Sequence, residues 1–442
     1  MAIEAITSKI VSTLGNKESL IPIMIKDGVD SASLTYKSYK EGGVIEGKDR
    51  AIDEFGTQAI WIGGIPFFKK AIDWTAYKLA KINPGVDVRV LANDEYASWA
   101  KENAKGIMNN SKTQTVKKAI TDCLADGGKK AKGLYKGKII AATALTLATY
   151  FLLTKGKHKN TKDSVLKDMQ KEMNDNFSYS LNNETPQVFA DFNEFNNNKK
   201  NISFKGVVKN VTDAILFNPV HNMKIIDAGI TTERLACSRN KTELAEHAIK
   251  EGGFLFLLYG FGNILEKKIN DFSSKVLKKP IDLCIDVLVD KKFEASLGHG
   301  NIEQDIKGLE VCKTLTDRLN FIKNNPENSL VQAAKKAKIV STVKDGSSSV
   351  VDTSKFIDMK AIDNLAGNMK EINSKFIQSG ETAKKFLNKT KGLKIASVMA
   401  NIGISCLFLG YLMPKAVYKY RQWKTGTTKF HVEQDIRNSK NK

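Results

Sequence analysis

Residues 48–72 read KDRAIDEFGTQAIWIGGIPFFKKAI, and residues 245–269 read AEHAIKEGGFLFLLYGFGNILEKKI. When the two stretches are aligned without gaps, acids, glycines and lysines coincide as well as apolar residues. The identical pairs include Ala51 with Ala248, Ile52 with Ile249, Glu54 with Glu251, Gly56 with Gly253, Gly63 with Gly260, Lys70 with Lys267 and Ile72 with Ile269. Chance resemblance between apolar helices does not account for identities at acids and lysines in one order. The pattern therefore predicts an internal duplication of one helical unit.

Each copy contains an early and a late apolar segment, and none of the four contains a charged residue. They are Phe55–Phe68 and Ile139–Thr154 in the first copy, and Gly252–Leu265 and Ile395–Met413 in the second. At about 1.5 Å per residue, the last segment spans roughly 28 Å as a helix, which matches a hydrocarbon core. Ile139–Thr154 reaches roughly 24 Å, and the early segments about 20 Å. The early segments therefore fit core helices, re-entrant hairpins or interfacial segments as well as spans.

The sequence outside these segments is mostly amphipathic helix, so we predict a mainly α protein. The run Val86–Leu91 alternates apolar and polar residues, which also fits a minor strand. Gly63-Gly64-Ile65-Pro66 predicts a break or kink in its helix. Gly260 and Gly262 form a lone G-x-G, which we interpret as a helix-packing site and not as a dinucleotide-binding turn.

The duplication divides the chain into four parts. We expect a first repeat unit at 1–154, a polar linker rich in Lys and Asn at 155–205, a second repeat unit at 206–425 and a polar tail at 426–442. The second unit contains an insertion at about 300–385. Its amphipathic, lysine-rich pattern predicts helices, and the first copy has no equivalent, so we expect it to be peripheral.

The composition is that of a folded protein with an unusual charge. Apolar residues make up 42% and charged residues 26% of the chain, but Lys and Arg number 69 against 48 Asp and Glu, a net charge of +21. Such a surface attracts anionic lipid or nucleic acid. Lysines outnumber arginines, which favours diffuse attraction over base recognition.

The cysteines and the N-terminus indicate the compartment. The five cysteines have no C-x-x-C spacing and are interpreted as free thiols in a reducing cytoplasm. The N-terminus lacks a basic region followed by an apolar stretch, so we expect no cleavable signal peptide. Tyr, Trp, Lys and Arg residues follow Met413, as at a headgroup interface, and favour a membrane location.

Two groups of residues are site candidates. Glu54 and Glu251 occupy the same position in both copies, before the early apolar segment. We interpret them as first-turn acids that stabilise a helix dipole, with an acid at the mouth of a membrane cavity as the alternative. Five lysines before Ile139 are candidates for contact with lipid or other anions: Lys129, Lys130, Lys132, Lys136 and Lys138.

Motifs for chemistry are weak. No P-loop, G-x-S-x-G or H-E-x-x-H pattern occurs, so we expect no enzymatic activity, no metal and no cofactor. Glu243, Glu246, His247 and Glu251 fall on one predicted helix, where an exposed charged face is a simpler explanation than a metal site.

Three readings of function follow. The favoured one is a membrane-associated structural or interaction protein built from a duplicated helical hairpin, bound to anionic lipid and compatible with protein partners or self-association. The second is a transport or pore component with its pathway between the repeats, which charge-free apolar segments disfavour. The third is a soluble basic helical protein that binds nucleic acid; it is less favoured because the aromatic residues concentrate in and beside the apolar runs.

Overall fold

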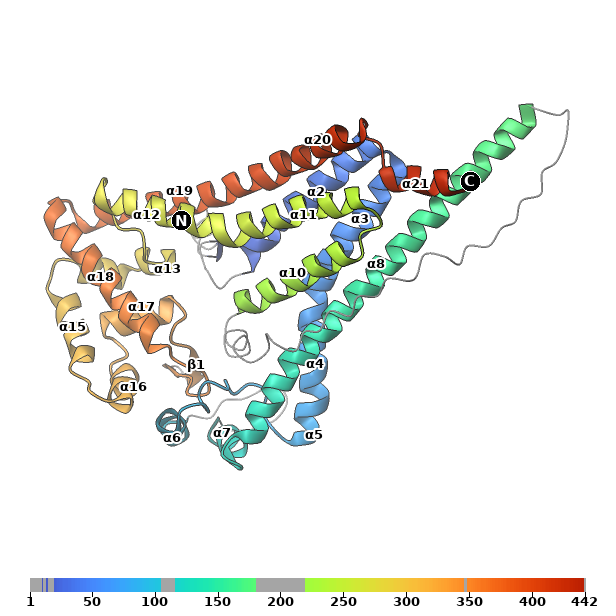
Figure 1. Cartoon of the computed structure of the whole chain (residues 1–442). Coiled ribbons are helices and arrows are strands. Elements are labelled where there is room, and N and C mark those ends of the chain that lie inside the picture. The colour runs from blue at the N-terminus through green and yellow to red at the C-terminus, as the bar shows by residue number, and fades with distance from the viewer. Residues whose placement is uncertain are drawn as a thin grey trace. The chain divides into compact units, whose positions relative to one another are not determined.

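A computed structural model describes residues 10, 13–14, 20–104, 116–179, 219–345 and 348–440. These residues are mainly helical, which confirms the predicted fold class (Figure 1). The elements up to residue 179 are α2 (Ile21–Gly42), α3 (Val44–Ala59), η1 (Ile60–Gly64), α4 (Ile65–Ile72), η2 (Asp73–Tyr77), α5 (Lys78–Ala80), α6 (Asp94–Glu102), α7 (Val116–Leu124) and α8 (Lys129–Tyr179).

The elements after residue 218 begin with α10 (Pro219–Ala236), α11 (Lys241–Leu255), η3 (Phe256–Phe261) and α12 (Gly262–Lys275). Short elements follow: α13 (Ile285–Leu288), α14 (Lys291–Ser296), α15 (Asn301–Glu310), α16 (Leu315–Asn324), α17 (Ser329–Lys336), β1 (Thr342–Asp345) and β2 (Ser348–Val351). The chain closes with α18 (Met359–Ser379), α19 (Ala383–Leu407), η4 (Phe408–Leu412), α20 (Met413–Thr425) and α21 (His431–Lys440).

The chain forms two compact units, each assembled from three stretches. Unit 1 comprises Met1–Val29, Gly64–Leu145 and Phe254–Leu409. Unit 2 comprises Asp30–Gly63, Thr146–Gly253 and Gly410–Lys442.

Unit 1 has an apolar core to which the predicted insertion contributes centrally. Ile302, Leu319 and Met369 from the insertion are fully buried in the same cluster as Trp99 and Ile120. The Trp99 indole also donates a hydrogen bond to Asn320, at 2.9 Å. The insertion is helical as predicted, but our expectation that it is peripheral is wrong. Its amphipathic helices bury their apolar faces against residues 77–100 and 116–131, which would otherwise expose theirs.

The run Val86–Leu91 does not form a strand. It folds into consecutive turns, with Val90 N–H donating to Asp87 at 3.0 Å and Leu91 N–H to Val88 at 3.1 Å. Val86 and Val90 are buried in the apolar cluster, not by strand pairing, which explains the alternation. In the described residues, strands occur only as the antiparallel hairpin β1–β2, in which Val343 pairs with Val350.

Several long helices contain π-helical turns. Pro66 follows η1 and Pro414 follows η4, each by two residues. Proline has no N–H and clashes with the carbonyl four residues earlier. That carbonyl belongs to the π-helical turn in both helices, so the altered bonding there lets the helix continue. The break predicted around Pro66 is therefore such a turn, within a helix that continues.

The two aligned copies carry corresponding elements. In the gap-free alignment, the first residue of α3 meets the first residue of α11, and the first residue of α4 meets the first residue of α12. The π-helical turns η1 and η3 lie between these helices in both copies. These bounds are what a duplication would produce.

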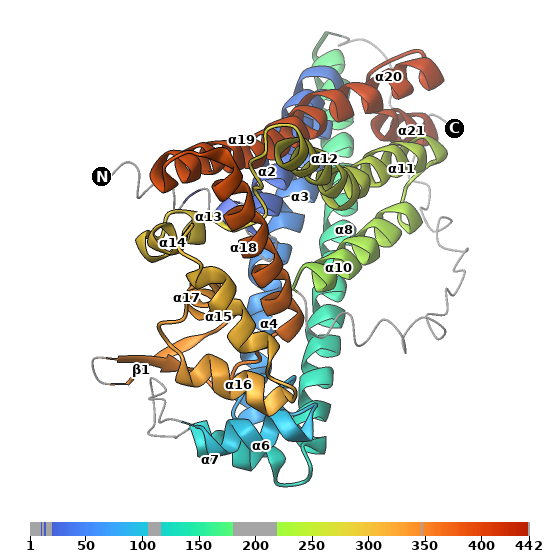
Figure 2. The same ribbon diagram turned by 90° about the vertical axis from the view of Figure 1, so that its left-hand side faces the viewer.

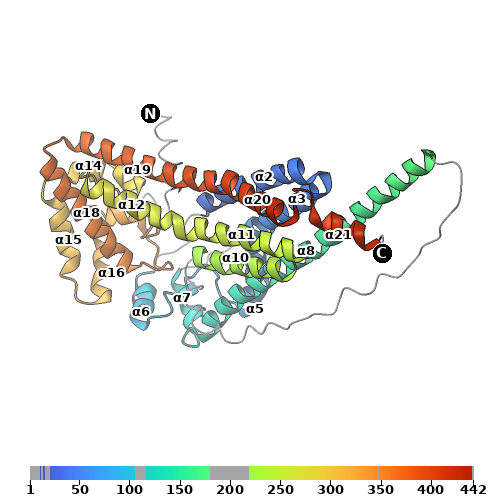
Figure 3. The same ribbon diagram turned by 45° about the horizontal axis from the view of Figure 1, so that its top comes forward.

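Two helical stretches are long and apolar enough to cross a membrane, Lys129–Asn174 and Ala383–Thr425. In unit 1, α12 runs beside α19, as Figures 2 and 3 show. Asn401 of α19 donates to the Gly262 carbonyl of α12 at 3.0 Å, and a methyl group at Gly262 would lie 3.4 Å from the Asn401 side chain. Gly262 thus serves close helix packing, as the sequence predicts.

The predicted linker and tail both contain helical residues. The polar linker expected from residue 155 begins within α8, which continues to Tyr179, and its residues 180–205 lie outside the described residues. The predicted tail contains α21, and Phe430 and His431 are both buried.

Candidate functional site

The main polar feature of the molecule is a network of buried charges in unit 2. The buried side of α3 consists of charged residues and one glycine, and the buried side of α11 consists of charged residues and one histidine. These residues recur at helical spacing and at equivalent positions of both copies: Glu46 and Glu243, Asp49 and Glu246, Arg50 and His247, Asp53 and Lys250, Glu54 and Glu251. A spacing of three and four residues keeps them on one face of each helix.

Arg421 of α20 joins one acid from each copy. Its guanidinium is fully buried and lies 2.7 Å from Glu46 of α3 and 2.7 Å from Glu246 of α11. The Tyr418 hydroxyl donates to Glu46 at 2.7 Å. Burial acts to raise the pKa of Glu246, but the hydrogen bonds from Arg421 and His431 lower that pKa to about 2. Glu246 is therefore ionised at neutral pH.

Arg239 likewise joins one acid of α3 to one acid of α11. It contacts Asp49 of α3 at 3.0 Å and Glu243 of α11 at 2.5 Å. Because Glu46 is equivalent to Glu243 and Asp49 to Glu246, each arginine takes one acid of each type from opposite copies. We name these the two arginine clamps. Their crossed pairing is the relation that a pseudo-two-fold axis would generate.

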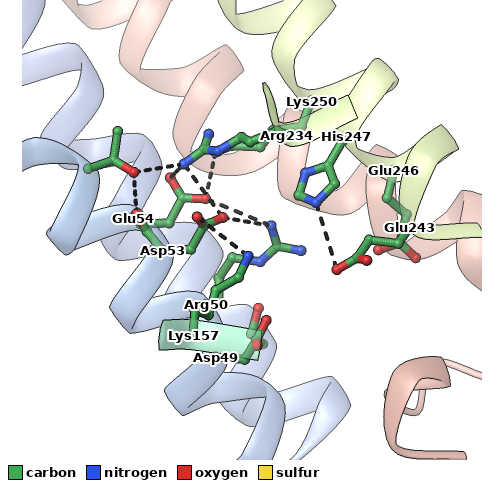
Figure 4. A network of polar contacts seen from close by, with 12 residues as sticks. Asp49, Arg50, Asp53, Glu54, Lys157, Arg234, Glu243, Glu246, His247 and Lys250 are labelled. Carbon is green, nitrogen blue, oxygen red and sulfur yellow. Dashed lines mark hydrogen bonds and ion pairs between the residues drawn. The ribbon is translucent and has the colours of Figure 1, made fainter. Parts of the chain in front are cut away.

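A third group lies further along both helices, at Asp53 and Glu54 of α3 and at Lys250 and Glu251 of α11, and Figure 4 shows part of it. Lys250 contacts Glu54 at 2.5 Å and Glu251 at 3.3 Å, and Arg234 of α10 pairs with Glu251 and lies 3.5 Å from Asp53. Arg50 and Lys157 also approach Asp53, at 3.9 and 3.5 Å. Burial acts to raise the pKa of Glu251, but Arg234 and Lys250 lower it to about 2.

This arrangement favours cohesion over chemistry. An arginine does not release its proton in proteins, so the acids that it binds stay ionised and occupied. Burial lowers the pKa of His247, more than its hydrogen bond with Glu243 raises it, so the imidazole is neutral at pH 7. In the described part of the chain, no group of three or more His, Cys, Asp or Glu residues is arranged to hold a metal ion. The network binds α3, α10, α11 and α20 of unit 2 to one another.

Two interpretations of these acids need correction. Glu54 lies well after the first turn of α3, and Glu251 near the end of α11, so neither stabilises a helix N-terminus. Both acids share the cations Lys250 and Arg234. The face of Glu243, Glu246, His247 and Glu251 is buried and not exposed, because Arg239, Arg421 and Arg234 pair with its three glutamates.

The five lysine candidates before Ile139 lie on α8 in unit 1. Lys129, Lys130 and Lys136 are exposed and Lys132 is partly exposed. Lys138 differs, because its ammonium group contacts both carboxylate oxygens of Asp73, at 2.5 and 2.7 Å. Four of the five are therefore available to an external anion without breaking an ion pair.

Sequence reasoning missed the arginines Arg234, Arg239 and Arg421. They lie outside the aligned stretches, so the repeat alignment does not single them out. The sequence nonetheless contained a signal that these faces are buried. The charged residues of α3 have the same spacing as the acids of α11, and the large apolar residues of α3 lie on its other faces.

Comparison with models of protein families, with curated proteins and with solved structures finds no match for this chain.

Proposed function

We propose that the protein is a membrane-embedded structural or interaction protein, in which a duplicated helical hairpin is held together from inside by ion pairs. The observation that carries the proposal is an inverted distribution of polarity. Most of the charged residues on α3 and α11 are buried, whereas Phe55 and Phe256, both within the early apolar segments, are 46% and 55% exposed. Charged residues inside and apolar residues outside suit a lipid solvent.

All four charge-free segments support this reading. Each exposes large apolar side chains: Phe55, Ile62 and Phe67; Ile140, Leu145 and Leu152; Phe256 and Ile264; Met399, Leu407 and Leu412. Only 17% of the most apolar window of Ala383–Thr425 is buried, whereas the core helix of a soluble protein would be mostly covered. Scattered exposed apolar residues are ordinary, but their concentration in four charge-free segments is not.

The transport alternative receives less support. The buried charges do offer polar groups beside the early apolar segments, but the arginine clamps occupy the acids permanently. A pathway residue has to exchange its partner during transport, and a buried guanidinium shared by two carboxylates holds both of them. The same clamps suit a scaffold, because they fix the helices of both copies.

Alkaline carbonate extraction of native membranes tests the proposal. We expect the full chain to remain in the membrane pellet and to float with liposomes after reconstitution. Complete recovery in the soluble fraction without detergent would refute membrane embedding.

Neutralising the four available lysines tests whether their positive charge binds anionic lipid. Changing Lys129, Lys130, Lys132 and Lys136 to Gln should weaken binding to anionic vesicles at low salt, by about 1 kcal/mol for each lysine that contacts the surface. Binding to zwitterionic vesicles should be unchanged. Tight, salt-steep binding to nucleic acid that depends on these lysines, with vesicle binding intact, would favour the nucleic-acid alternative.

A further inference from the structure

A second polar feature lies in unit 1, at the border of the last apolar segment. A pocket of about 580 Å³ opens where the C-terminal ends of α12 and α18 meet the start of α19. Lys278, Lys279, Lys375 and Lys389 line it, with Leu277 and Leu393. A volume of this size accommodates a small-molecule ligand.

The pocket is basic because its four lysines are accompanied by a single acid, which pairs with only two of them. Glu381 contacts Lys279 at 3.2 Å and Lys389 at 2.6 Å. Lys279 is 8% exposed and its ammonium group lies 3.9 Å from the centre of the Phe386 ring, so it is held in the wall. Among the described residues, the side chains of Lys278 and Lys375 have no hydrogen-bond or ion-pair partner. Two lysines are thus free to bind an anion.

The backbone at Lys278 decides which variant can test the pocket. Its φ of 54° lies in the left-handed region, where a helix usually ends on glycine because a Cβ is unfavourable there. Retaining a lysine at this position costs about 1 kcal/mol. Lys81 and Lys338 also have a left-handed backbone, so this geometry marks Lys278 as a position that suits glycine and does not by itself assign a role to its side chain.

The remaining walls are apolar and lead to the charge-free segment. Leu277 is 41% exposed and Val276, its neighbour, 62% exposed. Leu393 precedes Ile395, where the last apolar segment begins. A ligand that fits this site carries a negative headgroup and an apolar tail.

We propose that the pocket binds an anionic phospholipid, with Lys278 and Lys375 contacting the phosphate and the acyl chains lying along Leu277 and Leu393. The inference rests on the proposed membrane location and names a lipid partner for it. Basic pockets at the ends of membrane helices bind lipid phosphates in this way.

The test uses the purified full chain in neutral detergent, titrated with dioctanoyl phosphatidylglycerol. Lys278→Gly removes the charge and also relieves the left-handed backbone, so the variant should fold at least as stably as the parent. We expect its affinity to fall about fivefold, and that of Lys278→Gly/Lys375→Gln about thirtyfold, at about 1 kcal/mol per lysine.

The chain offers matched controls. Lys338 is exposed, also has a left-handed backbone with φ of 59°, and lies away from the pocket, so Lys338→Gly makes the same change elsewhere. Lys360, exposed on the same helix as Lys375, is the control for the glutamine variant. Both controls should retain the parental affinity.

The outcomes separate the pocket from the proposed function. Unchanged affinity in Lys278→Gly, or an equal loss in Lys338→Gly, would overturn the pocket, and so would equal binding of dioctanoyl phosphatidylcholine. Inorganic phosphate binding as tightly as the lipid would overturn the lipid assignment. A chain that carbonate extracts but that keeps Lys278-dependent lipid binding would refute membrane embedding and leave the pocket standing.

Discussion

The two units hold their helices together by opposite means. Unit 1 buries a continuous apolar cluster in which Trp99, Ile302 and Met369 are fully covered. Unit 2 buries acids on α3 and α11 and pairs them with Arg234, Arg239 and Arg421 from outside these two helices. Apolar burial is favourable because it removes surface from water, whereas buried ion pairs must offset the desolvation of their charges. The two interiors therefore depend on different energetic terms, the dehydration of apolar surface in unit 1 and the pairing of charges in unit 2.

Low pH should have the largest effect, because it should destabilise unit 2 before unit 1. The pKa values of Glu246 and Glu251 are about 2 in the folded chain against an ordinary 4.5. The unfolded chain therefore takes up protons first, so the stability that these acids contribute is complete above pH 4.5 and is lost as the pH falls towards 2. The core of unit 1 contains Cys123, whose pKa burial raises to about 11, and stays neutral throughout this range. Brief pepsin digestion between pH 4.5 and 2 should cut α3 and α11 before α15–α17; the reverse order would contradict the assignment.

Arg421→Met should have the next largest effect. It leaves Glu46 and Glu246 buried without their shared cation, which costs about 3–5 kcal/mol of unfolding free energy. Urea unfolding measures the change. Adding Glu46→Gln and Glu246→Gln to the same variant removes the stranded charges and should recover most of the loss. A single variant as stable as the parent would show that the clamp contributes nothing.

Ile62→Arg tests the exterior of unit 2. Ile62 is 42% exposed in the middle of the early apolar segment. In lipid, an arginine there should cost about 2.5–3.5 kcal/mol of insertion and lower the carbonate-resistant fraction. Val311, 73% exposed outside the apolar segments, gives the control Val311→Arg. If both variants behave alike, the exterior around Ile62 is aqueous.

The smallest expected effect compares one methylene in each environment. Ile302→Val removes it from the packed core of unit 1 and should cost about 1 kcal/mol of unfolding free energy. Ile62→Val removes it from an exposed position and should stay within about 0.5 kcal/mol of the parent. Thermal unfolding of the two variants sharpens the contrast, and a larger loss at Ile62 would place that residue in a packed core.

The sequence predicts the helical class, the four apolar segments and the matching elements of the two copies, because periodicity and repeats are local signals. It does not predict that residues 77–100 and 116–131 share a core with the insertion, since such contacts depend on tertiary packing. Val86–Leu91 shows the same limit: alternation signals alternate burial, which turns achieve here without a partner strand.

Only part of the candidate site could be predicted from the sequence. The acids of α3 and α11 could be found by their spacing, but whether a charged face is buried depends on its partners. Those partners are distant along the chain: Arg421 is 375 residues from Glu46 and 175 from Glu246. Pattern analysis within one helix therefore assigned the face to solvent.

The same separation in sequence delays the pairing of these residues during synthesis of the chain. A ribosome adds about 5–20 residues per second, so Glu46 emerges roughly 20–75 s before the arginine that will neutralise it, 375 residues later. Until then, Glu46 lacks the cation that offsets the cost of burying its carboxylate. We therefore expect the helix that carries it to remain in contact with water. The final assembly of unit 2 consequently waits for the synthesis of α20, whichever part of the protein folds first.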